Sequence, residues 1–166
     1  MDITYLGQNG FRIKGKSRTV ILDGDNKSEV VIKSEEADKI FKIDGPGEYE
    51  TGGVSVIGIA HESKTIFVIE MENLRIAHFM KLEQKLSQEQ VEEIGEIDIL
   101  IMDLTLGMEL AKQIDPWVVI PVSENGDKMI DFLKQMGKPD LPAIPKYSVT
   151  FERLPEEMQV IVLEKK

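Results

Sequence analysis

The side chains that could carry chemistry in this chain are mainly carboxylates and hydroxyls, because cysteine is absent and histidine occurs only at His61 and His78. A zinc hydrolase site needs several neutral imidazoles, so two histidines exclude most designs of that kind within one chain. The lack of cysteine also excludes thiolate ligands, cysteine nucleophiles and disulfides. His61 precedes a polar stretch typical of a solvated hairpin tip. His78 lies in an apolar run typical of a core or pocket-edge position.

The densest group of carboxylates is Glu35, Glu36 and Asp38, directly after an expected strand at residues 30–33. Carboxylate oxygens are the ligands that a hard cation such as Mg²⁺ prefers, and a carboxylate can also act as a general base. A run of charge after a strand is, however, typical of a solvated helix start. We favour the solvated start and keep the magnesium-type site as the alternative.

A glycine-rich stretch and one serine have simpler structural explanations. The stretch from Gly45 to Gly53 contains Pro46-Gly47, which suits a type II turn, and it lacks the lysine and the following helix of a phosphate-binding loop. Ser55 alternates with apolar residues as in a strand, without the glycine spacing of a nucleophile elbow. We interpret Trp117 as a core or layer-packing aromatic. No nucleophile is therefore assigned.

Short apolar runs must position these residues. The first half has the pattern of a strand meander, with a two-residue turn at Glu72-Asn73. From Ser87 the periodicity becomes helical, because Ser87 and Gln90 form a capping box and Gly95 ends the helix. Strands are expected at 3–6, 11–14, 19–22, 30–33, 41–44, 54–59, 65–71, 74–79, 97–103 and 117–122, helices at 88–94, 108–114 and 128–136, and a last pair of strands at 147–152 and 159–163.

Length and composition fit one soluble domain over residues 1–166. The chain is 42% hydrophobic and 30% charged, and no apolar run is long enough for a transmembrane helix. The N-terminus lacks the basic and apolar regions of a secretory signal, so we expect a cytoplasmic protein. The net charge of −10 repels phosphate backbones and anionic membranes, which argues against nucleic acid and membrane partners.

Several stretches, in order along the chain, resemble the metallo-β-lactamase fold, in particular its short Zn-dependent hydrolase branch that includes L-ascorbate-6-phosphate lactonase-like proteins. They are Ile3-Thr4-Tyr5-Leu6-Gly7, Ile43-Asp44-Gly45-Pro46-Gly47-Glu48-Tyr49-Glu50, Thr65-Ile66-Phe67-Val68-Ile69-Glu70, Leu74-Arg75-Ile76-Ala77-His78, Ile97-Asp98-Ile99-Leu100-Ile101, Gln113-Ile114-Asp115-Pro116-Trp117-Val118-Val119-Ile120-Pro121 and Leu154-Pro155-Glu156-Glu157-Met158-Gln159-Val160. The resemblance implies an α+β fold, a four-layered αββα sandwich of reduced size, with a metal site at one end of the facing sheets.

The residues that hold metal in that family are replaced here. Family members carry a His-x-His-x-Asp-His motif after a strand, and the matching segment is Ser34-Glu35-Glu36-Ala37-Asp38-Lys39, in which only Asp38 agrees. Further histidines of the family match Gln8, Gln84 and Ser123. The vestigial pocket expected from this comparison consists of Gln8, Ser34, Glu36, Asp38, Lys39, Gln84 and Ser123.

The resemblance with these replacements predicts a catalytically inactive, metal-free relative that uses no cofactor. Zinc hydrolysis requires a cation held by neutral imidazoles with an open position, and Lys39 adds a positive charge at one of those positions. The alternative is a hydrolase with a carboxylate site at Glu35, Glu36 and Asp38.

A scaffold without chemistry acts through its surface, so we expect a binding or assembly module. The chain is shorter than its relatives around residues 23–28 and after Lys39, which leaves apolar surface open at a sheet edge or helix face. This favours a homodimer, with another protein as a further possible partner.

Overall fold

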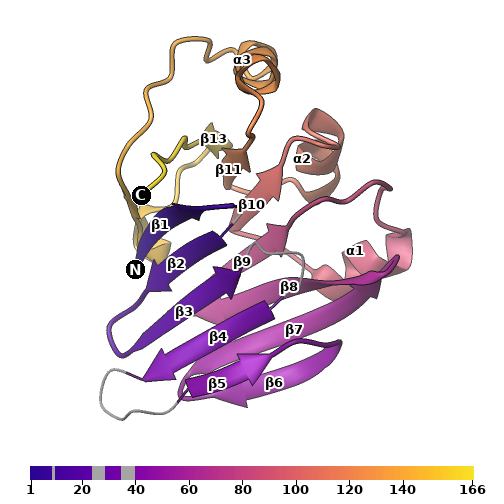
Figure 1. Ribbon diagram of the computed structural model, residues 1–166, viewed down its shortest axis with the longest axis vertical. Helices are drawn as coiled ribbons and strands as arrows, with labels where there is room; N and C mark the ends of the chain where they lie inside the picture. Colours follow the sequence, from indigo (N-terminus) through magenta and orange to yellow (C-terminus); the bar gives the residue numbers. More distant parts are fainter. Residues whose placement is uncertain (9, 24–28, 35–39) are drawn as a thin grey trace.

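Two twisted β-sheets face each other, and the helices lie beside one of them (Figure 1). The structure is a computed structural model that describes residues 1–8, 10–23, 29–34 and 40–166. Within these residues, no helix is both long and apolar enough to cross a lipid bilayer.

The first sheet has six strands in the order β12-β1-β2-β3-β4-β5, and all neighbours run antiparallel. Short turns join β1 to β2 and β2 to β3, as the meander pattern predicted. The strands are β1 (Asp2–Gly7), β2 (Gly10–Lys14), β3 (Arg18–Asp23), β4 (Glu29–Ser34), β5 (Ile40–Ile43) and β12 (Tyr147–Ser148).

The second sheet has seven strands in the order β13-β11-β10-β9-β8-β7-β6. Strands β6 to β9 form an antiparallel meander, whereas β9, β10, β11 and β13 run parallel. The near-continuous apolar sequences of β10 and β11 fit strands that are buried on both faces. The strands are β6 (Gly47–Thr51), β7 (Val54–His61), β8 (Lys64–Met71), β9 (Leu74–Phe79), β10 (Ile99–Asp103), β11 (Val118–Val122) and β13 (Gln159–Val160).

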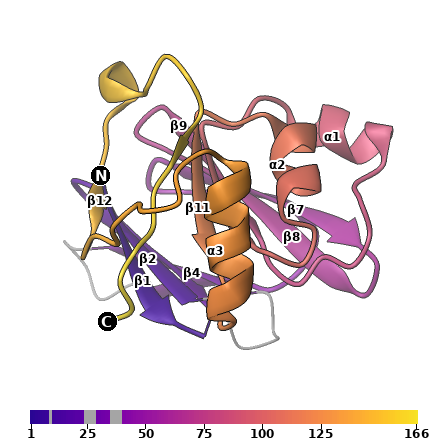
Figure 2. The ribbon, with the colours of Figure 1, turned by 90° about the horizontal axis from the view of Figure 1, so that it is seen from above.

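The three α-helices follow β9, β10 and β11 and pack on the outer face of the seven-stranded sheet (Figure 2). They are α1 (Gln88–Ile94), α2 (Met108–Ile114) and α3 (Gly126–Gln135), and a short 3₁₀ helix, η1, covers Phe151–Arg153. The predicted capping box of α1 is confirmed, with Ser87 and Gln90 bonded reciprocally and Gly95 at the C-cap. Asn125 caps α3 through two backbone N–H groups.

Two separate apolar clusters hold these layers together. One lies between the sheets and is formed by strand residues such as Ile13, Leu22, Ile69 and Ile101. The other lies between the seven-stranded sheet and the helices, and it includes Phe79, Leu110 and Phe132. Side chains alternate between the two faces of a strand, so the central strands of the seven-stranded sheet feed both clusters.

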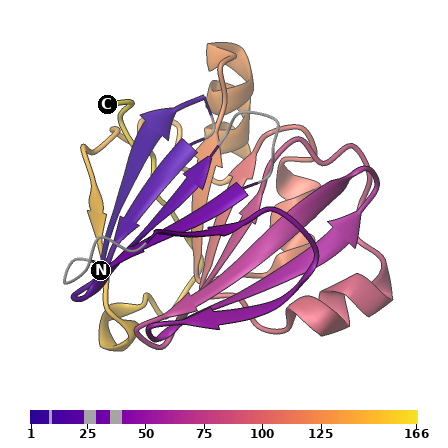
Figure 3. The same cartoon turned by 60° about the horizontal axis from the view of Figure 1, so that its bottom comes forward.

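The predicted α+β sandwich with two facing sheets is confirmed. All three α-helices lie on the side of the seven-stranded sheet (Figure 3). In the described part of the chain, no helix covers the outer face of the six-stranded sheet. Of the expected four layers, the described residues form the two sheets and one outer layer of helices.

Three local predictions were wrong. Residues 47–51 form strand β6, not the end of a turn, because Gly47 to Thr51 pair with β7. The last two strands do not pair with each other, since β12 joins β1 and β13 joins β11 in the other sheet. Trp117 is not a core residue, because 46% of its surface is exposed one position before β11 begins.

Candidate functional site

The carboxyl ends of β9, β10 and β11 meet at one end of the seven-stranded sheet. Phe79 pairs with Met102, and Met102 pairs with Pro121, so the residues that follow these three lie along one edge. Carboxyl ends of parallel strands are where sheets of this kind bind ligands. We call this edge, with residues 80–84, 103–105 and 123–125, the strand-end site.

The strand-end site contains three carboxylates, of which Glu83 and Glu124 are exposed and Asp103 has both of its oxygens bonded to the backbone. One accepts the N–H of Lys81, and the other accepts the N–H of Thr105 at 3.0 Å. The hydroxyl of Ser123 donates to the carbonyl oxygen of Asn125 at 2.9 Å and accepts the N–H of Asn125 at 3.1 Å. The hydrogen bonds of Asp103 and Ser123 therefore fix the loops that follow β10 and β11.

The segment that follows β9 is fixed by side chains from other elements. Lys64 donates from Nζ to the carbonyl oxygen of Lys81 at 2.7 Å. The amide of Gln113 donates to the carbonyl oxygen of Leu86 at 2.7 Å and accepts its N–H at 3.2 Å. Leu82 and Leu86 are buried in the helix-side cluster, whereas the Gln84 side chain is exposed. Lys81 has a φ of 56°, which turns the chain sharply after β9.

His61 was predicted to be solvated, and this was wrong, because only 6% of it is exposed. Its Nδ1 lies 3.2 Å from Oε1 of Gln90, and its Nε2 lies 3.2 Å from the carbonyl oxygen of Gln84. Oε1 of Gln90 is fixed as an acceptor, because it also accepts the N–H of Ser87 while Nε2 donates to Ala60. His61 therefore ties β7 to α1 and to the segment before α1.

His78 is buried, as its apolar surroundings predicted. It lies on β9 two residues beyond Ile76, which faces the cluster between the sheets. The ring of Phe11 meets it edge to face, with ring centroids 6.0 Å apart, and Tyr5 packs on Phe11 in turn. His78 thus packs with Phe11 and Tyr5 between the two sheets. It lies on the other side of the seven-stranded sheet from His61, which contacts α1.

Strand β4 runs away from the strand-end site. Arg18 pairs with Ser34, so the end of β4 lies beside the start of β3. The β8–β9 turn lies at the same end, because its residue Glu72 accepts the N–H of Lys16, which is in the turn between β2 and β3, at 2.6 Å. In Figure 1 the β4 arrow accordingly points opposite to the arrows of β9 and β10. Ser34 and the strand-end site are thus at opposite ends of the sandwich.

The structure therefore separates the residues of the expected vestigial pocket. Gln84 and Ser123 lie at the strand-end site, and Gln8 lies in the β1–β2 turn at the same end, with a φ of 50°. The backbone of Ser34 lies at the opposite end. Glu35, Glu36, Asp38 and Lys39 are outside the described residues, and their neighbours Ser34 and Ile40 both lie at the end opposite Gln84.

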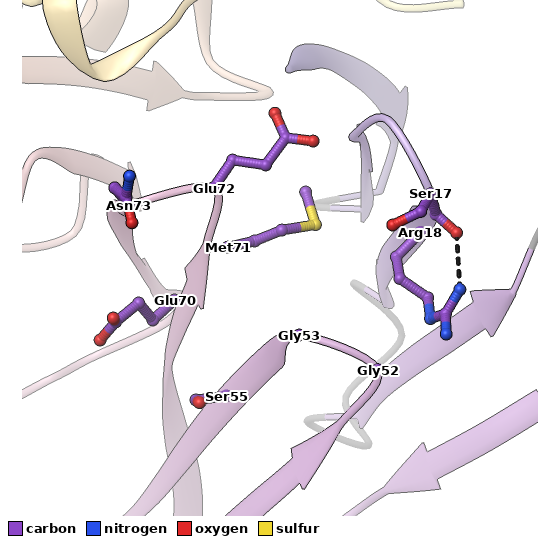
Figure 4. A pocket seen from close by; sticks show the side chains of 9 residues that line it. All are labelled: Ser17, Arg18, Gly52, Gly53, Ser55, Glu70, Met71, Glu72 and Asn73. Atoms are coloured by element: carbon purple, nitrogen blue, oxygen red, sulfur yellow. Dashed lines mark hydrogen bonds between the residues drawn. The ribbon is translucent and has the colours of Figure 1, made fainter.

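A polar cavity of about 360 Å³ opens at the end opposite the strand-end site, and sequence reasoning did not find it (Figure 4). Arg18 forms one wall, where its guanidinium donates to the carbonyl oxygen of Ser17 at 2.9 Å. Gly52 allows this, because a Cβ atom there would lie 2.6 Å from the central guanidinium carbon. Glu70 and Asn73 lie across the cavity. Its lining is polar, and Glu70 and Glu72 are the carboxylates in it.

The carboxylates of this cavity are engaged in structural contacts. Glu70 pairs with Arg75 at 3.0 Å, and Glu72 accepts the N–H of Lys16 and lies 3.5 Å from the N-terminal amine of Met1. The walls of this cavity come from three separate hairpin turns, so the turn residues are the only part of it that the sequence pattern could predict. The turns themselves were predicted, but how they come together was not.

A comparison with protein families identifies the fold's relatives. The model of the beta-lactamase superfamily domain matches residues 37–123, which is more than half of the chain. The chain belongs to the beta-lactamase superfamily. It is similar to a crystal structure from Thermotoga maritima, of a protein described as a candidate Zn-dependent hydrolase of the metallo-beta-lactamase superfamily. The two are 25% identical, the match covers 98% of each chain, and the TM-score is 0.79. No curated protein matches the chain significantly.

Membership in the beta-lactamase superfamily raises the question of whether zinc fits the strand-end site. In residues 1–8, 10–23, 29–34 and 40–166, no three His, Cys, Asp or Glu side chains lie close enough together to hold a metal ion. Zinc prefers imidazole, thiolate and carboxylate ligands. At this edge the positions that match family histidines offer an amide at Gln84 and a hydroxyl at Ser123, and the carboxylate of Asp103 is bonded to two backbone N–H groups. The donor set described at the strand-end site does not fit a zinc ion.

Proposed function

We propose that this chain is a catalytically inactive, metal-free member of the beta-lactamase superfamily that acts as a binding or assembly module. The observation that carries the proposal is the direction of β4. This strand separates the position that matches the family's first metal-binding histidine, Ser34, from Gln84 and Ser123. A centre that combined both ends would have to span the length of β4, roughly 17 Å at about 3.3 Å per residue.

The hydrogen bonds of the strand-end site also support the proposal. A hydrolytic metal must hold a water molecule at an open coordination position. Asp103, the carboxylate that ends β10 at the strand-end site, is bonded to two backbone N–H groups. Releasing it for a metal would leave both N–H groups without their acceptor, at a cost of about 1–3 kcal/mol each.

Elemental analysis of the purified protein tests the absence of metal. We expect no stoichiometric zinc, manganese or iron, and the same unfolding temperature with and without a chelator. A metal that binds only the folded state stabilises it by mass action, so its removal would lower the unfolding temperature. One tightly bound transition metal per chain would overturn the proposal.

A hydrolysis screen tests the absence of catalysis. We expect lactones, phosphodiesters and β-lactams to be hydrolysed no faster than in buffer, because no activated water or nucleophile is assigned. Saturable turnover that Asp38→Ala or Glu36→Ala abolishes would establish the alternative carboxylate site instead. Glu156→Ala is the matched control, since it removes an exposed carboxylate between η1 and β13.

A further inference from the structure

Strand β6 is a free edge of the seven-stranded sheet. In the described part of the chain it pairs with β7 alone, so its second side has no strand beside it. It lies at the lower border of the ribbon in Figure 1. Strands β6 to β9 alternate in direction, so a further antiparallel strand would continue the same pattern. The backbone of β6 is therefore a template for an extended segment of another molecule.

The turn after β6 determines which backbone groups face the open side. Gly52 and Gly53 have φ angles of 57° and 80°, as in the type I′ turn of a two-residue hairpin. Thr51, the residue before this turn, is therefore in a hydrogen-bonded pair with β7, and bonded and non-bonded pairs alternate along antiparallel strands. Glu48 and Glu50 are in the non-bonded pairs, so their N–H and C=O groups point to the open side.

The start of β6 is held in place before any partner binds. Gly58 on β7 allows the carbonyl oxygen of Gly45 to come close, because a Cβ atom on Gly58 would lie 2.5 Å from that oxygen. The hydroxyl of Tyr49 lies 3.2 Å from the carbonyl oxygens of Gly45 and Pro46, to which it donates. A pre-ordered edge loses less conformational freedom on binding than a mobile one, which favours the addition of a strand.

Glu48 and Glu50 give the open edge its charge. Tyr49, between them, packs against the cluster between the sheets, so the two carboxylates project from the opposite face. Both glutamates are exposed. The ion pairs of the described residues do not include either of them. Two carboxylates without a cation therefore lie beside the backbone groups that face the open side.

Arg75 and Arg18 are close to this edge, and both have other contacts. Arg75 is in the same row of the sheet as Glu50, but it pairs with Glu70 at 3.0 Å and donates to carbonyl oxygens at the end of α1. Arg18 reaches the turn after β6 from the six-stranded sheet and donates to the carbonyl oxygen of the residue before it at 2.9 Å. The row that contains Glu50 therefore keeps a net negative charge.

The two carboxylates select the kind of strand that can be added. Opposite charges on directly facing residues of neighbouring strands attract, and like charges repel. A second copy of β6 would place glutamate against glutamate, so this edge disfavours pairing with itself. A strand with lysine or arginine at two alternate positions matches Glu48 and Glu50. The net charge of −10 also attracts a basic segment from a distance.

We propose that β6 accepts an extended basic segment of a partner protein as an added antiparallel strand. The segment would pair along the five residues of β6, roughly 17 Å at about 3.4 Å per residue, with lysine or arginine facing Glu48 and Glu50. Main-chain hydrogen bonds would supply affinity, and the facing charges would supply specificity. The inference rests on the proposed binding role and gives that role a surface and a class of partner.

A designed peptide tests the charge of this edge. The probe is a fluorescein-labelled peptide of about nine residues in which lysine alternates with valine or threonine, and fluorescence anisotropy reports its binding. Glu48→Lys with Glu50→Lys should weaken binding about tenfold or more. The same variant should bind a peptide with glutamate in place of each lysine, which shows that the variant is folded.

Glu156→Lys with Glu157→Lys is the matched control. It changes the net charge by the same amount at two exposed positions between η1 and β13, and it should change the affinity for the lysine peptide less than about twofold.

Backbone methylation separates strand addition from simple charge attraction. Methyl groups on the amide nitrogens of the lysines should abolish binding, because these N–H groups face Glu48 and Glu50 in hydrogen-bonded pairs. Methyl groups on the valine and threonine nitrogens, which point away from β6, should change the affinity less than about twofold. The two methylated peptides carry the same charge, so a difference between them reports the hydrogen bonds alone.

Three results would overturn the proposal. They are no binding of the lysine peptide, equal weakening by both pairs of substitutions, and equal loss of binding by the two methylated peptides. Amide chemical-shift mapping gives a second readout, and we expect shifts in β6 and β7. Shifts confined to β5 would place the peptide on the other sheet and would also contradict it. Metal content is measured separately, so failure of the proposed inactivity is distinguishable from failure of the β6 edge.

Discussion

The side chain of Gln90 joins three parts of the structure: the start of α1, the end of β7 and His61. Its amide completes the capping box of α1 with Ser87 and donates to the carbonyl oxygen of Ala60 at 2.8 Å, and its Oε1 lies 3.2 Å from Nδ1 of His61. The sequence predicted the capping box, because Ser87 and Gln90 have the required spacing. It could not predict the contacts with Ala60 and His61, since these depend on how α1 docks on β7.

We expect Gln90→Ala to lower the free energy of unfolding by about 1–3 kcal/mol, because it removes the side-chain half of the capping box and leaves Nδ1 of His61 without its partner. Urea unfolding monitored by circular dichroism measures the change. Gln88→Ala is the matched control on the same helix, since Gln88 bonds only to Glu92 on the surface, and it should change stability by less than about 0.5 kcal/mol. Equal effects of the two substitutions would contradict the role assigned to Gln90.

Asp98 gives the stability of the fold a defined dependence on pH. Burial raises the pKa of its carboxyl above the ordinary value of 3.8, although the N–H of Arg75, 2.7 Å away, works in the opposite direction. A carboxyl with a raised folded-state pKa favours the folded state when it is protonated. Its contribution to stability is therefore lost as the pH rises through 3.8 and through the folded-state pKa.

Asp98→Asn tests this sign, because asparagine keeps an acceptor for Arg75 and cannot ionise. The free energy of unfolding of this variant minus that of the wild type should be larger at pH 7 than at pH 3.5, as measured by urea unfolding at both pH values. Asp98→Ala, which leaves the N–H of Arg75 without its acceptor, should lose about 1–2 kcal/mol at either pH. A wild type that gains stability over Asp98→Asn as the pH rises would show that the sign is wrong.

At the scale of elements, most strands and all three α-helices could be predicted because their patterns are local. The helix at Met108–Ile114 and the strand at Leu74–Phe79 have the predicted bounds. The errors fall where long-range contacts decide the structure. Residues 147–148 and 159–160 have the local pattern of a strand pair, yet each joins the edge of a different sheet.

The direction of β4 could also have been predicted from the sequence. Only five residues separate Asp23 from Glu29, and a crossover between parallel strands needs about a dozen or more. An antiparallel hairpin is the connection that fits. The comparison by resemblance matched Ser34 to a metal-binding histidine and grouped it with Gln84, because aligning residue types carries no information on strand direction.

Distances between paired spin labels test the direction of β4. The chain has no cysteine, so two engineered cysteines give defined labelling. Ser34→Cys with Ser17→Cys should give a short label separation by pulsed electron paramagnetic resonance, since both positions lie at one end of the sandwich. Ser34→Cys with Gln84→Cys should give a separation longer by roughly 17 Å, the length of the strand. Similar separations in both pairs would place Ser34 beside the strand-end site.

At the scale of the whole molecule, the resemblance predicted the fold better than local pattern did. The Thermotoga maritima structure matches over 98% of both chains, so the similarity extends over nearly the whole fold. What neither pattern nor resemblance predicted is the cavity lined by Arg18, because three turns from two sheets form it. Sites made by tertiary contact between turns leave no spacing signal in the sequence.

We propose that the whole molecule self-associates through β5. This strand is the edge of the six-stranded sheet, and in the described residues its second side has no partner strand. Ile40 is 68% exposed and Phe41 is 43% exposed, so apolar surface lies beside unpaired backbone groups. Two copies that pair β5 antiparallel about a twofold axis would satisfy these groups and cover Phe41.

Light scattering across a concentration series tests this homodimer. We expect a mass near twice 18.8 kDa at micromolar concentration, and a monomer for the pair Ile40→Glu and Phe41→Glu, because buried carboxylates at a β5 interface would lack partners. Ile130→Glu is the matched control, since Ile130 is a similarly exposed apolar residue on α3. The net charge of −10 opposes association only weakly at physiological salt, where charges beyond about 8 Å are screened. A monomeric mass up to high micromolar concentration would show that β5 does not pair, whereas a dimer that Ile130→Glu dissociates would place the interface on α3.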